Sequence, residues 1–288
     1  MKQVKAEVIS NKRILRELER RDAYTFKRPE ARNVSGSWLI WLKCPDIAAA
    51  AKPGQFVMVN CGEDCYLPRP FSVHRVNKDG MALFFNVWQD GKGTQWLSQR
   101  NTGDNVDIFG PLGNGFSINP EAHNLLLVAG GTGIAPLCFL AEESIKKGHS
   151  VKLLRGASGE SKPTGKENPS QHYPEELLPR GIEVHTITSS LDGRKGMVID
   201  LLPNFVDWAD QIFACGPTAM YRTMAKMPEL KNRPVQVSLE VVMGCGAGVC
   251  YGCTIRTKKG LKQVCKDGPV FEMGEMEWDN WGERGKAI

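Results

Sequence analysis

The chain has 288 residues, of which 41% are hydrophobic and 24% are charged, and its formal net charge is +5. That length suffices for two or three compact units, and the composition is that of an ordinary globular protein. The mild, dispersed charge gives no case for nucleic-acid binding, and no apolar run is long enough to predict a membrane span. No apolar signal-peptide region follows Met1, so we expect a cytoplasmic protein whose nine cysteines stay reduced.

The first part of the chain, residues 1–117, is predicted to form an antiparallel barrel. Residues 1–8 alternate between polar and apolar side chains, as a strand does. Strand composition recurs, between turn signals, in residues 55–60, 71–76 and 81–88. Short strands at this regular spacing are typical of barrels. The basic stretch 11–32 has few apolar positions, and we expect it to be a solvated loop or a short surface helix.

Residues 118–240 are predicted to form an α/β unit with a parallel sheet. Its first apolar run is continuous, which indicates a strand buried on both faces. The strand-like runs are residues 125–129, 151–154, 182–187, 211–214 and 235–239, and helix-compatible segments include 135–147 and 218–226. Such alternation is typical of a sheet flanked by helices. Residues 158–174 are rich in Ser, Gly, Pro and Lys and are expected to be an exposed loop.

The barrel carries a short motif that can hold a pyrophosphate, Arg69-Pro70-Phe71-Ser72. An Arg can clamp a pyrophosphate with two hydrogen bonds, while a neighbouring hydroxyl reaches a ring nitrogen. Gly93 and Thr94 follow another strand and could offer donors to the same phosphates. A surface Arg beside a turn is the alternative for so short a motif.

Two glycine turns follow predicted strands of the α/β unit. The first consists of Gly130, Gly131, Thr132 and Gly133 and opens a helix-compatible segment. This is the context in which a dinucleotide phosphate meets a helix N-terminus, although the pattern is G-x-G-x-x-P rather than G-x-G-x-x-G. The second turn consists of Cys215, Gly216 and Pro217, at the carboxyl edge of the same sheet. A tight turn without a ligand is the alternative for each.

The last part, residues 241–288, carries four cysteines in the pattern C-x4-C-x2-C-x11-C. They are Cys245, Cys250, Cys253 and Cys265. This is the spacing of a plant-type [2Fe–2S] loop, and the glycines between them let backbone N–H groups approach the sulfurs. A structural zinc is the main alternative, but the second short-spaced cysteine pair of such sites is missing. A disulfide scaffold suits small secreted chains instead. The cysteines outside these motifs, Cys44, Cys61, Cys65 and Cys138, show no partner pattern and are expected to be buried free thiols.

In this order, the motifs R-P-F-S, G-x-G-T, G-P-L-G-x-G-F, G-G-T-G-I-A-P and C-G-P resemble the ferredoxin–NADP reductase superfamily. The cysteine loop, followed by Val264-Cys265-Lys266, makes the chain similar to the electron-transfer subunits of class 1B dihydroorotate dehydrogenases. The resemblance covers nearly the whole chain. It implies FAD in the barrel, NAD at the parallel sheet and a [2Fe–2S] cluster in the last unit. It adds Asn86, Val87 and Trp88 to the flavin-binding residues.

The resemblance also implies a partner and a division of labour. In that family an FMN-containing catalytic subunit oxidises dihydroorotate to orotate in pyrimidine biosynthesis, in a heterotetramer of two of each subunit. This chain would then be an electron relay that exchanges electrons with NAD, with no catalytic acid or base of its own. The alternative is the small subunit of a ferredoxin- or sulfide-linked NAD(P)H oxidoreductase. Such subunits have Asp at the first cluster position, where this chain has Cys245. A third hypothesis is a zinc-bound assembly factor without enzymatic activity.

The choice between NAD and NADP is less clear in the sequence. A basic pair for a 2′-phosphate is not evident after the second parallel strand, near Arg155, and Lys162 lies in the expected loop. The segment 188–193, Thr-Ser-Ser-Leu-Asp-Gly, also replaces the acidic T-D-D-G-S run that is common in the family. We therefore predict NAD.

Overall fold

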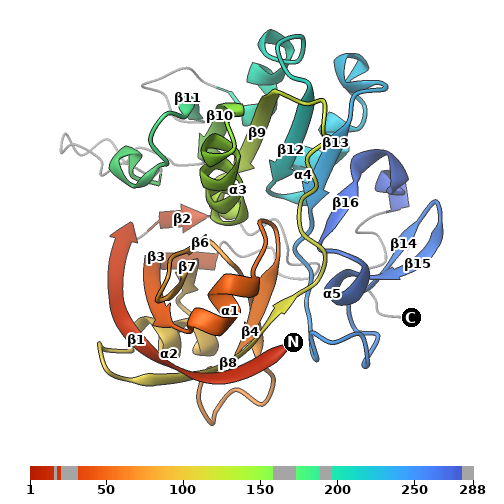
Figure 1. The fold of residues 1–288 in the computed structure, drawn as a ribbon. Helices are drawn as coiled ribbons and strands as arrows, with labels where there is room; N and C mark the ends of the chain where they lie inside the picture. Colours follow the sequence, from red (N-terminus) through yellow and green to blue (C-terminus); the bar gives the residue numbers. More distant parts are fainter. Residues whose placement is uncertain (16–17, 21–31, 158–172, 189–195, 281–288) are drawn as a thin grey trace.

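The computed structural model describes residues 1–15, 18–20, 32–157, 173–188 and 196–280. Three parts lie against one another (Figure 1): a curled sheet from the first part of the chain, a second sheet with helices, and a small cysteine-bearing part beside both. The order of these parts along the chain is the order that the sequence predicts.

The first sheet is antiparallel throughout and curls into a barrel. Its strands are β1 (Lys2–Leu15), β2 (Leu18–Arg20), β3 (Arg32–Lys43), β4 (Phe56–Val59), β5 (Arg69–Ser72), β6 (Arg75–Val76), β7 (Gly80–Trp88) and β8 (Asn105–Leu112). They follow the order β5-β4-β8-β1-β3-β7-β6, with β2 paired to β3. Strands β5 and β6 stand at opposite ends of this order, yet only Val73 and His74 separate them. Val73 N–H bonds the carbonyl of Gln55 on one side, and His74 N–H bonds that of Ala82 on the other, which closes the barrel.

The second sheet has five parallel strands and one antiparallel edge strand. They are β9 (Asn124–Gly130), β10 (Ser150–Ala157), β11 (Glu183–Thr188), β12 (Gln211–Cys215), β13 (Val235–Ser238) and β16 (Val270–Glu272), in the order β11-β10-β9-β12-β13-β16. Leu125 and Leu127 of β9 pack on one face with helix α3 (Ile134–Lys146), and Leu126 and Val128 pack on the other. The central strand is therefore buried on both faces, as its apolar run predicts.

The remaining elements are short. The helices are α1 (Pro45–Ala50), α2 (Lys92–Ser98), α4 (Thr218–Met224) and α5 (Val264–Asp267), and β14 (Thr254–Thr257) pairs with β15 (Gly260–Gln263) as a hairpin. Single 3-10 turns are Gly131–Gly133, Glu175–Leu177, Val198–Asn204, Pro228–Leu230, Met273–Glu275 and Trp278–Asn280. One apolar cluster includes Met58 of the barrel, Tyr221 of α4 and Cys265 of α5, so the three parts share a continuous core.

The expectation for the basic stretch 11–32 is wrong where the structure describes it. Strand β1 continues to Leu15, and residues 18–20 form β2. Asn11 shows why the strand continues, because its side-chain amide donates to the carbonyls of Leu97, Ser98 and Arg100 and so replaces the missing apolar contacts. Residues 16–17, 21–31 and the predicted loop 158–172 lie outside the described part of the chain.

Two further expectations can be compared with the structure. All nine cysteines are free, and of the four outside any predicted site, Cys44, Cys61 and Cys138 are buried and Cys65 is half-buried. Burial raises the pKa of the Cys61 thiol to about 12, although the charge of Arg69 opposes the shift, so this thiol stays protonated. Within the described residues, no helix is both long and apolar enough to cross a membrane.

Candidate functional site

The predicted flavin-binding residues come from β5, β7 and the start of α2. Arg69 is exposed at the beginning of β5, and a Cβ placed on Gly93 would lie 3.3 Å from both Cγ and Nε of Arg69. The structure therefore brings the arginine and the α2 turn together, and the missing side chain at Gly93 leaves room for the arginine. Thr94 Oγ donates locally to the carbonyl of Gly91, at 3.2 Å. An exposed guanidinium beside the start of a helix is suited to a pyrophosphate.

The other predicted flavin residues divide by burial. Phe71 and Val87 belong to the barrel core, where the Phe71 ring packs edge-on against Phe85 at 5.5 Å between centroids. Asn86 is also buried, and its side-chain oxygen accepts a hydrogen bond of 2.6 Å from Ser37. Pro70, Ser72 and Trp88 are half-buried and leave part of their surface to solvent. Side-chain contact with a ligand is therefore available to these three and to Arg69, while the buried residues shape the barrel wall.

The two glycine turns meet at the carboxyl edge of the second sheet. A Cβ on Gly216 would lie 3.0 Å from the Cα of Gly130, and one on Gly133 would lie 1.8 Å from the carbonyl oxygen of Cys215. Only glycine permits this approach. Burial raises the pKa of Cys215 well above that of a free thiol, so this residue packs as a neutral group. The two turns together form a surface of backbone at the edge where ligands bind in open α/β sheets.

Helix α3 begins directly after the first glycine turn. No side chain caps its N-terminus, and Gly131 and Thr132 are only half-buried. The first N–H groups of the helix and its dipole are thus available to a phosphate. Sequence reasoning missed Tyr221, whose hydroxyl accepts from Gly216 N–H at 2.8 Å and donates to the carbonyl of Ser238 at 2.6 Å. This residue holds the second turn in place, and its partners lie five and 17 residues away, a spacing that matches none of the motifs used above.

Arg155, the cation nearest the region that would distinguish NADP from NAD, is already engaged in hydrogen bonds within the protein. Arg155, near the end of β10, is buried and donates to the Thr186 hydroxyl at 2.8 Å, to the carbonyl of Tyr173 and to the carboxylate of Glu175 at 2.7 Å. These bonds hold its guanidinium away from a 2′-phosphate. Lys162 lies outside the described residues, as does most of the segment 188–193.

The four predicted cluster cysteines lie in one region, formed by the cysteine loop (residues 244–253) and the start of α5. Cys245 Sγ accepts backbone N–H groups from Ala247, Val249 and Cys250, at 3.3 to 3.4 Å. Cys265 Sγ accepts from Gly248 at 3.1 Å, and Cys253 Sγ accepts from Cys265 at 3.4 Å. N–H groups aimed at sulfur are the environment in which iron-bound thiolates are stabilised.

The pKa values of two cysteines follow from this arrangement. Partial burial opposes ionisation of Cys245, but the N–H groups of Ala247, Cys250 and Val249 outweigh it and lower its pKa to about 6. Burial raises the pKa of Cys265 to about 12, helped by its contact with Cys253 and opposed by Gly248 N–H. Neighbouring thiolates repel one another, so joint ionisation of all four needs a cation.

Cys250 hydrogen-bonds to Cys245 and Cys253 to Cys265, and the charge of Cys245 also acts on Cys265. In the described part of the chain, no three His, Cys, Asp or Glu side chains gather closely enough to hold one metal ion. The spacing C-x4-C-x2-C-x11-C lacks the second short-spaced pair of a tetrahedral zinc site. It suits two irons, each bound by one pair of thiolates. The donor set therefore fits a [2Fe–2S] cluster.

The cysteine loop contacts the barrel through Gly246. Its φ is +67°, and a Cβ there would lie 2.5 Å from Cγ of Met58 on β4 and 3.3 Å from Cδ1 of Leu112 on β8. Both the conformation and the space require glycine. The loop that carries the cysteines thus lies directly on the wall of the barrel that carries the predicted flavin residues.

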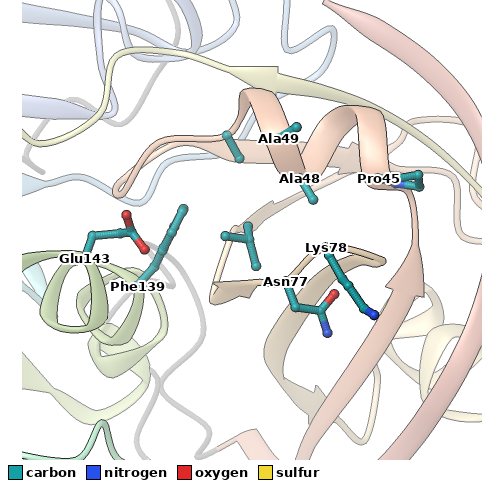
Figure 2. Close-up of a pocket in the computed structure, with 9 residues that line it drawn as sticks. Pro45, Ala48, Ala49, Asn77, Lys78, Phe139 and Glu143 are labelled. Atoms are coloured by element: carbon teal, nitrogen blue, oxygen red, sulfur yellow. The ribbon is translucent and has the colours of Figure 1, made fainter. Parts of the chain in front are cut away.

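A cavity of about 300 Å³ lies apart from these sites, between the barrel and the second sheet. Figure 2 shows it between α1, the turn that carries Asn77 and Lys78, and the side of α3 that carries Phe139 and Glu143. None of the predicted site residues lines it.

Comparison with known proteins now decides the family. A model described as the iron–sulfur cluster binding domain of dihydroorotate dehydrogenase B matches residues 240–277. The dihydroorotate dehydrogenase B (NAD(+)), electron transfer subunit, of Caldanaerobacter subterraneus subsp. tengcongensis is 37% identical over 223 residues, which covers 76% of this chain and 84% of that relative. The subunit of the same name from Bacillus caldolyticus is 38% identical over 234 residues, with 78% and 86% covered. The chain belongs to the family of dihydroorotate dehydrogenase B electron transfer subunits.

Solved structures confirm the predicted fold for this member of the dihydroorotate dehydrogenase B electron transfer subunit family. The NADH-dependent reduced ferredoxin-NADP oxidoreductase structure matches with a TM-score of 0.77 at 25% identity, over 98% of this chain and 93% of that chain. A ferredoxin reductase in carbazole 1,9a-dioxygenase matches with a TM-score of 0.63 at 18% identity, over 82% and 68%, and shows the fold alone. The barrel, the α/β sheet and the iron–sulfur part are thus those of a flavin-dependent reductase, and FAD, NAD and [2Fe–2S] are the cofactors that belong to them.

Proposed function

We propose that this chain relays electrons between NAD and the FMN of a separate subunit that oxidises dihydroorotate to orotate. The family supports the reaction, and the contact of Gly246 with Met58 and Leu112 supports the route, because it joins the cluster region directly to the flavin barrel. A flavin bound between the nicotinamide site and the cluster would accept or give two electrons on one side and single electrons on the other.

The residues divide this work among three places. Arg69 and the turn at Gly93 and Thr94 hold the flavin pyrophosphate on the barrel. The turns at Gly130–Gly133 and Cys215–Pro217, with the N-terminus of α3, hold the nucleotide pyrophosphate. Cys245, Cys250, Cys253 and Cys265 hold the cluster, and the N–H groups of the cysteine loop stabilise their sulfurs. No acid–base pair is required of this chain, because hydride and electron transfer belong to its cofactors.

The partner subunit docks over the cysteine loop. Val249 and Tyr251 of that loop are 74% and 68% exposed, which favours contact with a partner over packing around the cluster. Val242, 88% exposed, adds a third apolar side chain that the sequence did not reveal. Exposed apolar side chains clustered near a redox centre favour a protein partner that covers them.

Reconstitution tests this function. The chain alone, loaded with its cofactors, should oxidise NADH with artificial acceptors and should leave dihydroorotate unchanged. Addition of an FMN-containing dihydroorotate dehydrogenase catalytic subunit should create dihydroorotate oxidation coupled to reduction of NAD. Oxidation of dihydroorotate by this chain alone, or no gain with that partner, would contradict the proposal.

A ferredoxin-linked oxidoreductase is the second candidate, and one observation favours it: the match to the NADH-dependent ferredoxin-NADP oxidoreductase covers nearly the whole of both chains. The higher identity to the dihydroorotate dehydrogenase B subunits, 37% to 38%, and the cysteine at position 245 weigh against it. To test this candidate, the chain is given reduced ferredoxin in place of dihydroorotate and its FMN-containing subunit. Faster NAD(P) reduction with ferredoxin than with the FMN-containing subunit would favour this candidate.

A further inference from the structure

Helix α3 carries the predicted nucleotide-binding turn at its N-terminus, and one face of it rests on the barrel (Figure 1). Ala135, Phe139 and Glu142 are spaced four and three residues apart, so they lie on the same face of the helix. Each contacts the barrel in a different way. These three residues, with His74, Arg75 and Tyr173, are called the α3 junction below.

The polar centre of the α3 junction is His74, which is fully buried where the barrel closes. Its Nδ1 donates to the carbonyl of Ala135 in the first turn of α3, at 2.8 Å. Its Nε2 accepts from the hydroxyl of Tyr173, also at 2.8 Å. Since a carbonyl can only accept, this pair of bonds fixes one neutral tautomer of the ring. Burial lowers the pKa of His74 to about 3, aided by the Arg75 charge and opposed by the bond to Ala135, so the ring stays neutral.

Two further contacts hold the helix farther along its length. Phe139 inserts its ring into the apolar cluster of the barrel. Arg75 pairs with Glu142, at 3.0 Å between Nε and the carboxylate oxygen, and also donates to the carbonyl of Leu177. Both charged side chains of this ion pair are largely buried, with 16% and 22% exposed, so solvent screens their attraction only weakly.

Tyr173 joins the junction to the second sheet. Its ring packs edge-on against Phe84 of β7 at 5.0 Å between centroids, and its carbonyl accepts from Arg155 of β10. Arg155 in turn holds Thr186 on β11. The hydrogen bonds therefore run from the barrel through Tyr173 to two strands whose carboxyl ends form the nucleotide edge.

Apolar packing holds α3 on the second sheet, but its packing against the barrel is interrupted. The cavity of about 300 Å³ separates α3 from α1, and Glu143 and Phe139 of α3 face into it in Figure 2. The contacts of His74, Arg75 and Phe139 therefore set the position of the helix relative to the barrel. His74 and Arg75 lie two and three positions beyond the flavin motif Arg69–Ser72. Ala135 lies two positions beyond the glycine turn Gly131–Gly133.

We propose that the α3 junction is a positioning device that sets the nicotinamide site against the flavin site, with His74 as its central residue. Hydride transfer needs its reacting atoms about 3–3.5 Å apart, and a displacement of about 1 Å can slow it about 100-fold. The bond between His74 and Ala135 links the two cofactor-binding segments at a point two positions beyond each of them. This inference rests on the NAD and FAD part of the proposed function alone.

Anaerobic rapid mixing of the cofactor-loaded chain with NADH, without any partner, tests the proposal. Tyr173→Phe removes the bond to His74 but keeps the ring, and Glu142→Gln removes the charge that holds Arg75. Arg233→Gln, which breaks the exposed ion pair with Asp207, is the matched control. We expect the first two variants to lower the rate of flavin bleaching at saturating NADH about tenfold or more. The half-saturating NADH concentration should change less than about twofold, and the control should match the wild type.

Hydrogen exchange gives a readout that does not depend on turnover. Amides after the first turn of α3, which are hydrogen-bonded within the helix, should exchange faster in Tyr173→Phe than in the control, because the helix has lost one of its contacts with the barrel. If Tyr173→Phe and Glu142→Gln unfold more easily but bleach the flavin at the wild-type rate, the junction is only structural and the proposal is wrong. A wild-type flavin that NADH does not reduce would instead contradict the proposed function itself.

Discussion

Two contacts of the barrel with the rest of the described chain differ in kind. At the α3 junction, a buried histidine, an ion pair and an inserted phenylalanine hold the helix in one place. At the cysteine loop, a glycine lies against Met58 and Leu112, and the exposed Asn114 donates to the carbonyl of Asp267 at 3.0 Å. Hydride transfer requires aligned contact between reactants, whereas an electron can pass between centres that do not touch. The tighter contact thus stands where the chemistry demands alignment.

The most severe change on the cysteine-loop side is Cys250→Ser or Cys253→Ser. Each should abolish most of the [2Fe–2S] signal in electron paramagnetic resonance of the reduced protein, because a pair of thiolates is broken. Flavin absorbance should largely remain, because the barrel does not depend on these sulfurs. Cys65→Ser, outside the cysteine loop, is the control. An unchanged signal in both variants would remove these residues from the ligand set.

Gly246→Ala should break the cysteine-loop contact itself. The new Cβ would meet Met58 at 2.5 Å, and the backbone has φ +67°. Gly260→Ala is a matched control, since φ there is +98° but no atom lies within 4 Å. Chemical unfolding should show Gly246→Ala less stable than the control by about 1–3 kcal/mol. Equal stability of the two variants would mean that the loop moves away from the barrel without loss.

Arg69→Ala tests the flavin site of the barrel, the part that makes both the α3 junction and the cysteine-loop contact. Loss of a charge-assisted bond to pyrophosphate should weaken flavin binding by about 1.5–3 kcal/mol. The purified variant should lose flavin on dilution, measured by absorbance after filtration, and keep its circular dichroism spectrum. Arg69→Lys, which keeps the charge but not the paired donors, should fall in between. Full flavin occupancy in the alanine variant would make Arg69 a surface residue.

His74 should make the stability of the α3 junction depend on pH. Its folded pKa of about 3 lies below that of an unfolded histidine, so the unfolded chain binds more protons between the two values. Stability should therefore fall as pH drops from about 6.5 toward about 3, by about 1.4 kcal/mol per pH unit from this residue. Urea unfolding from about pH 7 to about pH 5 should show a smaller slope for His74→Gln. Identical slopes would show that His74 is protonated in the folded chain.

The sequence predicts those features that depend on residues close to one another along the chain. Three of the four cysteines fall within nine residues, and the apolar run before Gly130 marks a buried strand. The α3 junction has no such mark, because His74 and Tyr173 are 99 residues apart. The strand that continues through Asn11 escapes prediction for the same reason. The three carbonyls that its side chain reaches lie 86 to 89 residues away, and without them a polar stretch has the composition of a loop.

Strand β16 has a consequence for how this chain can be divided. It comes from the proposed cluster unit, residues 241–288, yet it pairs with β13 of the preceding unit through Gln236, Val237 and Ser238. A chain cut after residue 240 would leave β13 as an open sheet edge, ready to pair with another molecule. The iron–sulfur part is therefore not a removable attachment. A truncated reductase without it should aggregate, even though every flavin and nucleotide residue named above would still be present.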